Sequence, residues 1–455
     1  MKRILSLVCL FGLSLPAVVQ ASKAQEFTLT NGLKLIVKED HRAPVVVSQV
    51  WYKVGSSYEY SGITGLSHFL EHMMFKGTKE YPSGQFSKII SENGGRENAF
   101  TGKDYTAYFQ RLEKDRLEIS FKLESDRMKN IIFKEEDFAK EIKVVMEERR
   151  LRTEDNPQAL VYEQMMASAY LSNTYRNPVI GWMNDLDNMR LSDLANWYKL
   201  WYAPNNATIV VVGDVNTAFI VYLAKKYFGA IPRVDMPPLK PIHEPEQLGV
   251  KRLEVKLPAK VPYMIMGYKV PVINTADIEW EPYALEVLIN VLDGGNSSRF
   301  SKTLIREKSI AASISTSYSA SERLDTLLTF SAVPTKNHTI ADVEHALRGQ
   351  IELMKTTLVT PAELNRVKAQ VMADTIYQQD SGFYQAMQMG SLETTGVGWR
   401  LLDSYVDKLK AVTAEQVQTV AKKYLIDKGL TIAELKPQPM TKNTQLPARL
   451  STGRH

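Results

Sequence analysis

Cysteine is almost absent from this chain of 455 residues, since Cys9 is the only one. Cys9 lies in an N-terminal stretch that we expect to be removed on export, so the mature chain would contain no thiol. Disulfide bonds and thiolate metal ligands are then excluded, and any metal site has to be built from histidine and carboxylate side chains. An exported chain without cysteine is typical of the bacterial periplasm.

Long hydrophobic runs are also missing. Lys2 and Arg3 are followed by an apolar stretch over residues 4–19, and the small residue Ala21 follows it. A membrane-spanning helix needs about 20 apolar residues, which neither this stretch nor any later one provides. We therefore predict a cleavable signal peptide over residues 1–21 and a periplasmic location, with an uncleaved inner-membrane anchor as the alternative.

No charge sign dominates the composition. The chain has 56 Lys and Arg against 51 Asp and Glu, a formal net charge of +5. Because no basic stripe with interleaved aromatic residues is present, we expect no nucleic-acid partner. The composition, 44% hydrophobic and 24% charged, is that of a globular protein, and the length predicts two or more domains.

Proline is concentrated in one segment. Residues 232–246 show no hydrophobic periodicity and predict a stiff linker. Its five prolines are Pro232, Pro237, Pro238, Pro241 and Pro245. The linker separates an N-terminal half, residues 22–231, from a C-terminal half, residues 247–436. The polar residues 437–455 are predicted to form a disordered tail.

Histidine is scarce as well, yet two of the seven fall four residues apart, in His68-Phe69-Leu70-Glu71-His72. The Leu, Phe and Met residues around them predict a helix, on which positions i and i+4 share a face. Both imidazoles can therefore bind one Zn²⁺, and Glu71 can take the proton of a zinc-bound water. The alternative is two unrelated histidines beside a surface glutamate. The apolar surroundings disfavour it, because unpaired buried charges are costly.

A catalytic zinc site needs a third protein ligand, and here it has to be a carboxylate. The segment 135–152 predicts a half-buried helix, and Glu141 and Glu148 lie on its apolar face. Glu147 is rotated by roughly 100° from Glu148 and faces elsewhere. We predict Glu148 as the ligand and Glu141 as a carboxylate that orients a histidine ring. A solvated charged face is the alternative.

The two halves look like copies of one unit. The strand-like segment 208–212 is echoed by 431–435, and the pair 181–182 by 398–399. An apolar helix over residues 284–292 matches the motif helix. Its residues opposite His68, Glu71 and His72 are Glu286, Ile289 and Asn290. The sequence therefore predicts a duplication in which the C-terminal half has lost the metal-binding residues.

The motif with its distant glutamate resembles that of the pitrilysin (insulinase) family of zinc peptidases, which carries the inverted His-x-x-Glu-His motif. The length is similar to that of its mitochondrial-processing-peptidase-like bacterial subgroup. The resemblance runs from about residue 26 to residue 435 and includes segments 75–78 and 294–299.

The resemblance implies an α+β fold with two homologous half-domains, each an antiparallel sheet covered by helices, joined by the proline-rich linker. Two such chains would close around a chamber that admits unfolded peptides. One zinc ion per chain would be held by His68, His72 and Glu148, with Glu71 as general base. An edge strand would pair with the substrate backbone, which gives affinity with little sequence preference. Its residues here are Asn98, Ala99, Phe100 and Thr101.

The chain departs from the family pattern at one point. Members that complete the site from a second half carry an Arg and a Tyr seven residues apart, which bind the substrate carbonyl. Arg306 stands at the Arg position, but the residue seven further on is Ser313, and Tyr318 lies beyond it. We therefore expect a heterodimer in which a homologous chain without the zinc motif supplies the Arg-Tyr pair, in preference to a homodimer.

The sequence thus predicts a zinc endopeptidase. One alternative is a non-catalytic scaffold or peptide-binding subunit of a larger complex that retains zinc. Another is an assembly subunit of a membrane complex. A structural zinc site has no use for Glu71, which favours the enzyme.

Overall fold

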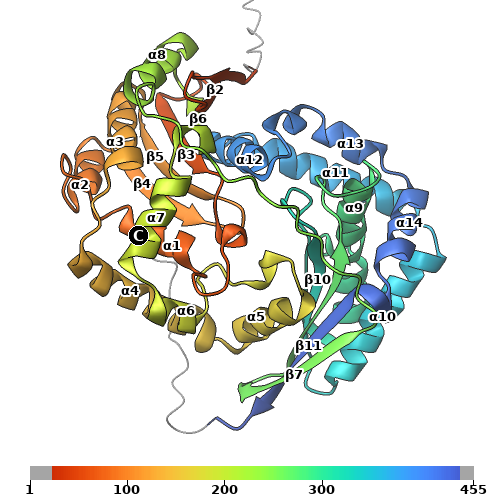
Figure 1. Cartoon of the computed structure of the whole chain (residues 1–455). Coiled ribbons are helices and arrows are strands. Elements are labelled where there is room, and N and C mark those ends of the chain that lie inside the picture. The colour runs from red at the N-terminus through yellow and green to blue at the C-terminus, as the bar shows by residue number, and fades with distance from the viewer. Residues whose placement is uncertain (1–22, 441–455) are drawn as a thin grey trace, which may run out of the picture.

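The computed structural model describes residues 23–440, and the chain forms two halves, each built around its own β-sheet (Figure 1). The predicted signal peptide lies outside the described residues, and of the predicted tail only residues 437–440 are described. Between residues 23 and 440, no helix is both long and apolar enough to cross a membrane.

The first sheet has six strands in the order β1-β2-β6-β3-β5-β4. They are β1 (Gln25–Thr28), β2 (Lys34–Glu39), β3 (Val45–Tyr52), β4 (Arg96–Thr101), β5 (Thr106–Glu113) and β6 (Ala207–Gly213). The turn between β1 and β2 contains Asn31 and Gly32, as the Asn-Gly pair predicts. Strand β4 lies at the edge of the sheet, where its outer backbone groups have no neighbour among the strands of residues 23–440.

The second sheet has five strands in the order β7-β11-β8-β10-β9. They are β7 (Lys251–Pro258), β8 (Tyr263–Val270), β9 (Ala311–Ser317), β10 (Thr326–Pro334) and β11 (Leu430–Gln438). Strand β11 reaches two residues into the predicted disordered tail, because Pro437 and Gln438 still pair with β7. Strand β9 is the edge strand that corresponds to β4.

The sequence analysis predicts antiparallel sheets, but each sheet also contains one parallel pair of strands. Strands β2 and β6 run parallel, and so do β7 and β11, whereas the other neighbouring strands are antiparallel. A parallel pair requires a long crossover, which the helices before the last strand of each half supply. Apart from β1, both sheets have the same strand order and the same parallel pair. This agreement supports the predicted relationship between the halves.

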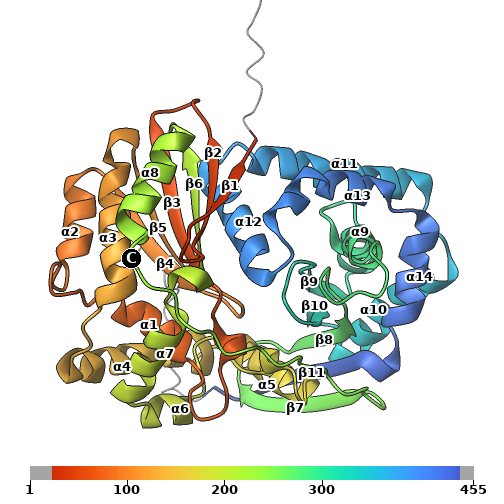
Figure 2. The ribbon, with the colours of Figure 1, turned by 45° about the horizontal axis from the view of Figure 1, so that its top comes forward.

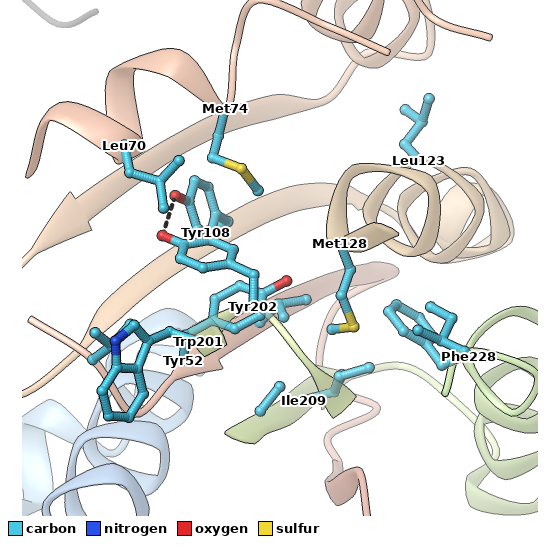
Figure 3. Packing of buried hydrophobic residues seen from close by; sticks show 14 of the residues in the cluster. Tyr52, Leu70, Met74, Tyr108, Leu123, Met128, Trp201, Tyr202, Ile209 and Phe228 are labelled. Atoms are coloured by element: carbon cyan, nitrogen blue, oxygen red, sulfur yellow. Dashed lines mark hydrogen bonds between the residues drawn. The ribbon is translucent and has the colours of Figure 1, made fainter. Parts of the chain in front are cut away.

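One face of the first sheet packs against helices of the first half. They are α1 (Leu66–Met73), α2 (Gln85–Glu92), α3 (Leu117–Asn130), α4 (Glu135–Arg149), α6 (Met183–Asn188), α7 (Leu191–Trp201) and α8 (Thr217–Phe228). Figure 3 shows Leu70 and Met74, from the motif helix and its end, pointing toward the sheet at Tyr108. The Tyr108 hydroxyl pairs with that of Tyr202 at 2.9 Å, which satisfies two polar groups inside this core.

The second sheet is covered in the same way by helices of the second half. They are α9 (Glu281–Asp293), α10 (Ile340–Thr356), α11 (Pro361–Gln378), α13 (Tyr405–Ala411) and α14 (Ala414–Tyr424). Helix α9 corresponds to the motif helix, and most of the apolar residues predicted for it are buried.

The other face of each sheet is covered by a helix from the opposite half (Figure 2). Helix α5 (Pro157–Ala169) packs its Val161, Met165 and Ala169 against the second sheet. Helix α12 (Gly382–Thr395) packs against the first sheet, and Gly390 lies so close to Trp51 that a Cβ would come within 2.1 Å of the indole ring. The halves therefore share their cores.

The proline-rich connection contains no helix or strand over residues 232–250. It is nevertheless fixed to the first half, because the Glu244 carboxylate accepts three backbone hydrogen bonds at 2.8–2.9 Å. The donors are the N–H groups of Leu171, Ser172 and Asn173. Lys269 of the second half pairs with the same carboxylate at 2.9 Å, so Glu244 joins the linker to both halves.

Candidate metal centre

The motif helix α1 directs its two histidines to one side. Phe69, Leu70 and Met73 are fully buried in the first core and anchor the helix. His68 and His72, one turn apart, lie on the side that carries no core residue, and their ring centroids are 4.8 Å apart. The spacing seen in the sequence is thus realised as a pair of neighbouring imidazoles.

The start of α1 is held by groups that the sequence analysis did not identify. The buried Glu59 accepts hydrogen bonds from the N–H groups of Gly65 at 2.7 Å and Ser67 at 2.6 Å. Gly65 has a φ of +85°, and a Cβ there would come within 2.5 Å of the Ile180 carbonyl oxygen. A carboxylate near a helix N-terminus is a recognisable signal, but Glu59 lies too far before α1 to be chosen from sequence alone.

Helix α4 brings Glu148 to the two histidines. Glu148 Oε1 lies 3.8 Å from His68 Nε2, and Glu148 Oε2 lies 3.4 Å from His72 Nε2. One donor atom from each of the three residues lies within 4.8 Å of the others. The α-helix ends at Arg149, one residue after Glu148, and passes into a π-helical turn over Arg150–Glu154. From that turn, the exposed Arg152 pairs with Glu148.

These distances fit a zinc ion. Ligand atoms bound about 2.0–2.2 Å from a tetrahedral ion lie roughly 3.3–3.6 Å from one another, close to the separations of Glu148 from His68 and His72. Two imidazole nitrogens and one carboxylate form a three-ligand set of the kind that catalytic zinc sites use, which leaves a fourth position for water or substrate.

Glu141 contacts one of the rings. Its Oε1 lies 3.0 Å from His72 Nδ1, and its other oxygen pairs with Lys76. With Nδ1 engaged in this way, Nε2 of His72 faces Glu148 and is free to bind a metal. Glu147, the neighbour of Glu148, is exposed and pairs with Arg150 instead. The helical rotation that separates the two glutamates in the sequence therefore separates them in space.

The pKa values of the two histidines are shifted in opposite directions. Burial and the neighbouring His72 lower the pKa of His68 to about 4, so its imidazole is neutral and keeps a lone pair. Burial also acts to lower the pKa of His72, but Glu141 and Glu148 outweigh it and raise the pKa to about 9. A metal ion would replace the proton that these carboxylates favour on His72.

Glu71 stands beside this group. Its Oε2 accepts a hydrogen bond of 2.5 Å from the hydroxyl of Thr101, the last residue of edge strand β4. Burial raises the pKa of Glu71, whereas Thr101 and His72 act to lower it. Helix α1 and strand β4 thus meet at the one carboxylate that the predicted reaction needs as a base.

The other predicted substrate-binding residues divide into two places. Asn98, Ala99 and Phe100 lie on β4, next to Thr101 and Glu71. Arg306 lies elsewhere, in the π-helical segment Phe300–Glu307 of the second half, where it is exposed. This segment packs against β9, α9 and α10.

The missing tyrosine is not replaced by Tyr318. Ser313 lies exposed on edge strand β9, where the family pattern expects a tyrosine. The Tyr318 hydroxyl donates to the Pro271 carbonyl oxygen at 2.7 Å, so it is already used inside the second half. Folding therefore does not restore the Arg-Tyr pair that the sequence lacks.

Comparisons with known proteins identify the family. The family model described as "Insulinase (Peptidase family M16)" matches residues 34–182, which include α1 and α4, and "Peptidase M16 inactive domain" matches residues 188–371. The zinc protease PqqE of Helicobacter pylori is 33% identical over 84% of this chain and 86% of its own length. The chain belongs to peptidase family M16, the insulinase family.

Solved M16 structures show the same fold. A protease from Helicobacter pylori superimposes with a TM-score of 0.86 at 30% identity, and the match covers 91% of this chain and all of that one. The periplasmic protease PqqL from Escherichia coli superimposes with a TM-score of 0.77 at 16% identity, over 93% of this chain and 49% of PqqL. The predicted family and α+β fold are confirmed, and membership of M16 makes this chain a zinc metallopeptidase.

Proposed function

We propose that this M16 protein is an endopeptidase that hydrolyses unfolded peptides or small protein segments, with one zinc ion per chain. The observation that carries the proposal is the convergence of His68, His72 and Glu148, with the buried Glu71 beside them. A binding protein has no need of an additional carboxylate that does not bind the metal at such a site.

The roles follow from the chemistry of each side chain. His68, His72 and Glu148 would hold the ion. Zinc, when bound, supplies a Lewis acid that polarises the scissile carbonyl and acidifies water. Glu71 accepts a proton from the attacking water and later gives it to the leaving amine. Burial raises the pKa of Glu71, which strengthens it as a base, and the Thr101 hydroxyl fixes the position of its carboxylate.

Substrate would add to the first sheet as a further strand along β4. The outer edge of β4 has no neighbour among the described strands, and the strand ends at the residue that holds Glu71. A peptide bound to Asn98, Ala99, Phe100 and Thr101 through its backbone would therefore pass the base. Backbone pairing of this kind requires an extended chain, which is the reason for expecting unfolded substrates.

The decisive test replaces Glu71 with Gln. We expect Glu71→Gln to bind zinc as the parent does, while kcat/KM for a quenched fluorescent peptide falls by about 10³-fold or more. His68→Ala and Glu148→Gln should instead lose the metal, measured by elemental analysis after dialysis. Parental activity in Glu71→Gln would overturn the mechanism. A zinc-loaded parent that cleaves no peptide, alone or with a partner, would favour the scaffold or peptide-binding alternative.

We further infer that a homologous chain without the zinc motif completes the site by supplying an Arg-Tyr pair around a closed chamber. Ser313 at the tyrosine position and the engaged Tyr318 hydroxyl support this. PqqL matches this chain over only 49% of its length, as expected if one PqqL chain corresponds to two chains of this size. Full peptidase activity of the chain purified alone would refute the heterodimer.

We also propose a periplasmic location. PqqL is described as a periplasmic protease, and the predicted signal peptide would export this chain to the same compartment. The assignment to the mitochondrial-processing-peptidase-like bacterial subgroup is proposed on the two-half length alone.

A further inference from the structure

A second cavity lies in the half that has lost the metal-binding residues. Its volume is about 440 Å³, within the range of sites for small ligands. Residues of helices α9, α11, α12 and α13 line it. Of these helices, α12 packs against the first sheet, as Figure 2 shows. Polar side chains reach it from α9 as Glu286 and Asn290, from α11 as Asp374, and from α13 as Tyr405.

The cavity occupies the place of the metal centre in the second half. Helix α9 corresponds to α1, and Glu286 and Asn290 stand at the positions of His68 and His72. The side chains at two metal-binding positions have therefore changed from imidazoles to a carboxylate and an amide, while both still face a cavity.

The third position follows the same correspondence. Helix α11 is the second α-helix after β10, as α4 is the second α-helix after β5. Asp374 lies at the same distance from the N-cap Thr360 as Glu148 does from the N-cap Lys134. Asp374 is exposed at the cavity, so this carboxylate marks a side that solvent reaches.

The charged side chains among the described residues that line the cavity are all acidic. Among the described residues that line the cavity there are two carboxylates, Glu286 and Asp374, and no Lys, Arg or His. Tyr405 donates a hydrogen bond of 2.6 Å to Glu286 Oε2, and no described residue donates to Oε1. Burial raises the pKa of Glu286 to about 7, as expected for a carboxylate without a cationic partner.

A metal ion does not satisfy this site. Among residues 23–440, only His68, His72 and Glu148 form a cluster of three ligand groups close enough to hold an ion. Two carboxylates, an amide and phenol groups around a cavity match instead a cation that carries its own hydrogen-bond donors, such as an ammonium group.

The cavity also adjoins the proposed path of substrate. Tyr105 of the first half lines it, and the Tyr105 ring contacts Phe100 of edge strand β4 with a centroid distance of 6.1 Å. Trp51 packs edge-on against the Tyr105 ring at 5.0 Å and holds it in place. A peptide that leaves β4 beyond Thr101 therefore comes next to a side chain that forms the cavity wall.

We propose that this cavity binds a primary ammonium group carried by a peptide, with the half-buried Glu286 carboxylate as its inner partner, ionised by the bound ammonium group, and Asp374 as the anion at the exposed side. A lysine side chain and a free peptide N-terminus share this chemistry. The assignment of the ligand as a peptide rests on the proposed peptidase function, whereas the preference for an ammonium group rests on the cavity itself.

The test measures binding rather than cleavage. Three decapeptides of Ala, Ser and Val would carry a C-terminal fluorophore: one with a free N-terminus, one acetylated with a single lysine, and one acetylated with norleucine in its place. Binding to the full chain in a Glu71→Gln background, followed by fluorescence anisotropy, should be about tenfold tighter for at least one ammonium peptide than for the norleucine peptide. Which peptide gains affinity identifies the source of the ammonium group.

Single-residue variants test whether the preference for an ammonium group arises in this cavity. Adding Glu286→Gln should abolish the preference, and Asp374→Asn, at an exposed residue that tolerates change, should reduce it about two- to threefold. Glu352→Gln, the same change on the exposed face of α10, should leave it intact. Equal binding of all three peptides, no binding of any, or a preference that survives Glu286→Gln and Asp374→Asn would overturn the proposal. Since cleavage by the parent is assayed separately, an inactive parent with intact ammonium preference would refute only the peptidase function.

Discussion

Local environment separates Glu71 from the two other glutamates near the motif helix, Glu141 and Glu148. Burial acts to raise all three pKa values. For Glu141, hydrogen bonds from His72 and Lys76 outweigh it and lower the pKa, and for Glu148 the two histidines and Arg152 do the same. Glu71 has only Thr101 as a hydrogen-bond donor, so burial dominates and its pKa rises. The residue left with the raised pKa is the proposed base.

At the residue scale, we expect Glu141→Gln to weaken zinc binding about 10- to 100-fold, because the ring of His72 loses its charged partner. Competition with a fluorescent chelator measures this affinity. Glu147→Gln is the matched control, since Glu147 lies on the same helix but is exposed and pairs with Arg150. Equal zinc affinity in the two variants would show that Glu141 does not orient the ring.

At the scale of single elements, the site depends on how α1 begins. The helix is only eight residues long, too short to be stable by itself. Its position is fixed by Glu59 at the N-terminus and by the close approach of Gly65 to Gly181, where an added Cβ would come within 2.4 Å of the Thr64 carbonyl oxygen. The end of α4 is tied to the same place, because the buried Arg149 donates to the Gly181 carbonyl oxygen at 2.7 Å and to Glu163 of α5 at 2.8 Å.

Gly65→Ala therefore should destabilise the protein by about 3 kcal/mol and impair zinc binding, since both the positive φ and the contact with Ile180 oppose a side chain. Gly84→Ala provides the control, because Gly84 has a φ of +78° but no atom within 4 Å of its added Cβ. It should cost about 1 kcal/mol. Chemical denaturation compares the two, and equal losses would mean that the close approach contributes nothing.

At the scale of the whole molecule, the halves are not independent. Helix α5 closes the core of the second sheet and α12 closes that of the first. An ion pair of 3.2 Å between the half-buried Arg323 and the buried Asp104 also joins them. The linker divides the sequence near its middle, but the hydrophobic cores cross that division.

We predict that residues 22–231 and residues 247–436, expressed separately, each expose an apolar sheet face and bind a hydrophobic dye or aggregate. Co-expression should restore a soluble complex, because each fragment supplies the helix that the other lacks. The intact chain should unfold in a single transition. A separate half that stays monomeric, binds no dye and unfolds cooperatively would contradict the shared core.

The linker contact predicts a dependence on pH. Burial acts to raise the pKa of Glu244, but Lys269 and the three backbone donors outweigh it and lower the pKa to about 2. A lowered folded-state pKa stabilises the fold fully above the unfolded value of about 4.5, and this contribution is lost as pH falls toward 2.

Glu244→Gln should thus lower the free energy of unfolding by about 1–3 kcal/mol at pH 7, and the difference from the parent should shrink below pH 4.5. Urea titrations at several pH values measure this. Glu246→Gln, two residues further along and 70% exposed, should change little at any pH. A Glu244→Gln defect that is the same at pH 3 and pH 7 would show that the charge is not responsible.

The sequence by itself determined what local spacing can encode. Positions four apart on a helix share a face, which placed His68 beside His72, and the helical angle between adjacent residues selected Glu148 over Glu147. The repeated pattern gave the correspondence of α9 with α1. What only the tertiary structure decided depends on contacts between distant segments: the parallel pairs β2–β6 and β7–β11, the exchange of α5 and α12, and the bonds of Glu59 and Thr101 to the motif helix. A single chain carries no local signal for such pairings, because they are selected by the burial of apolar faces and buried polar groups over the whole fold.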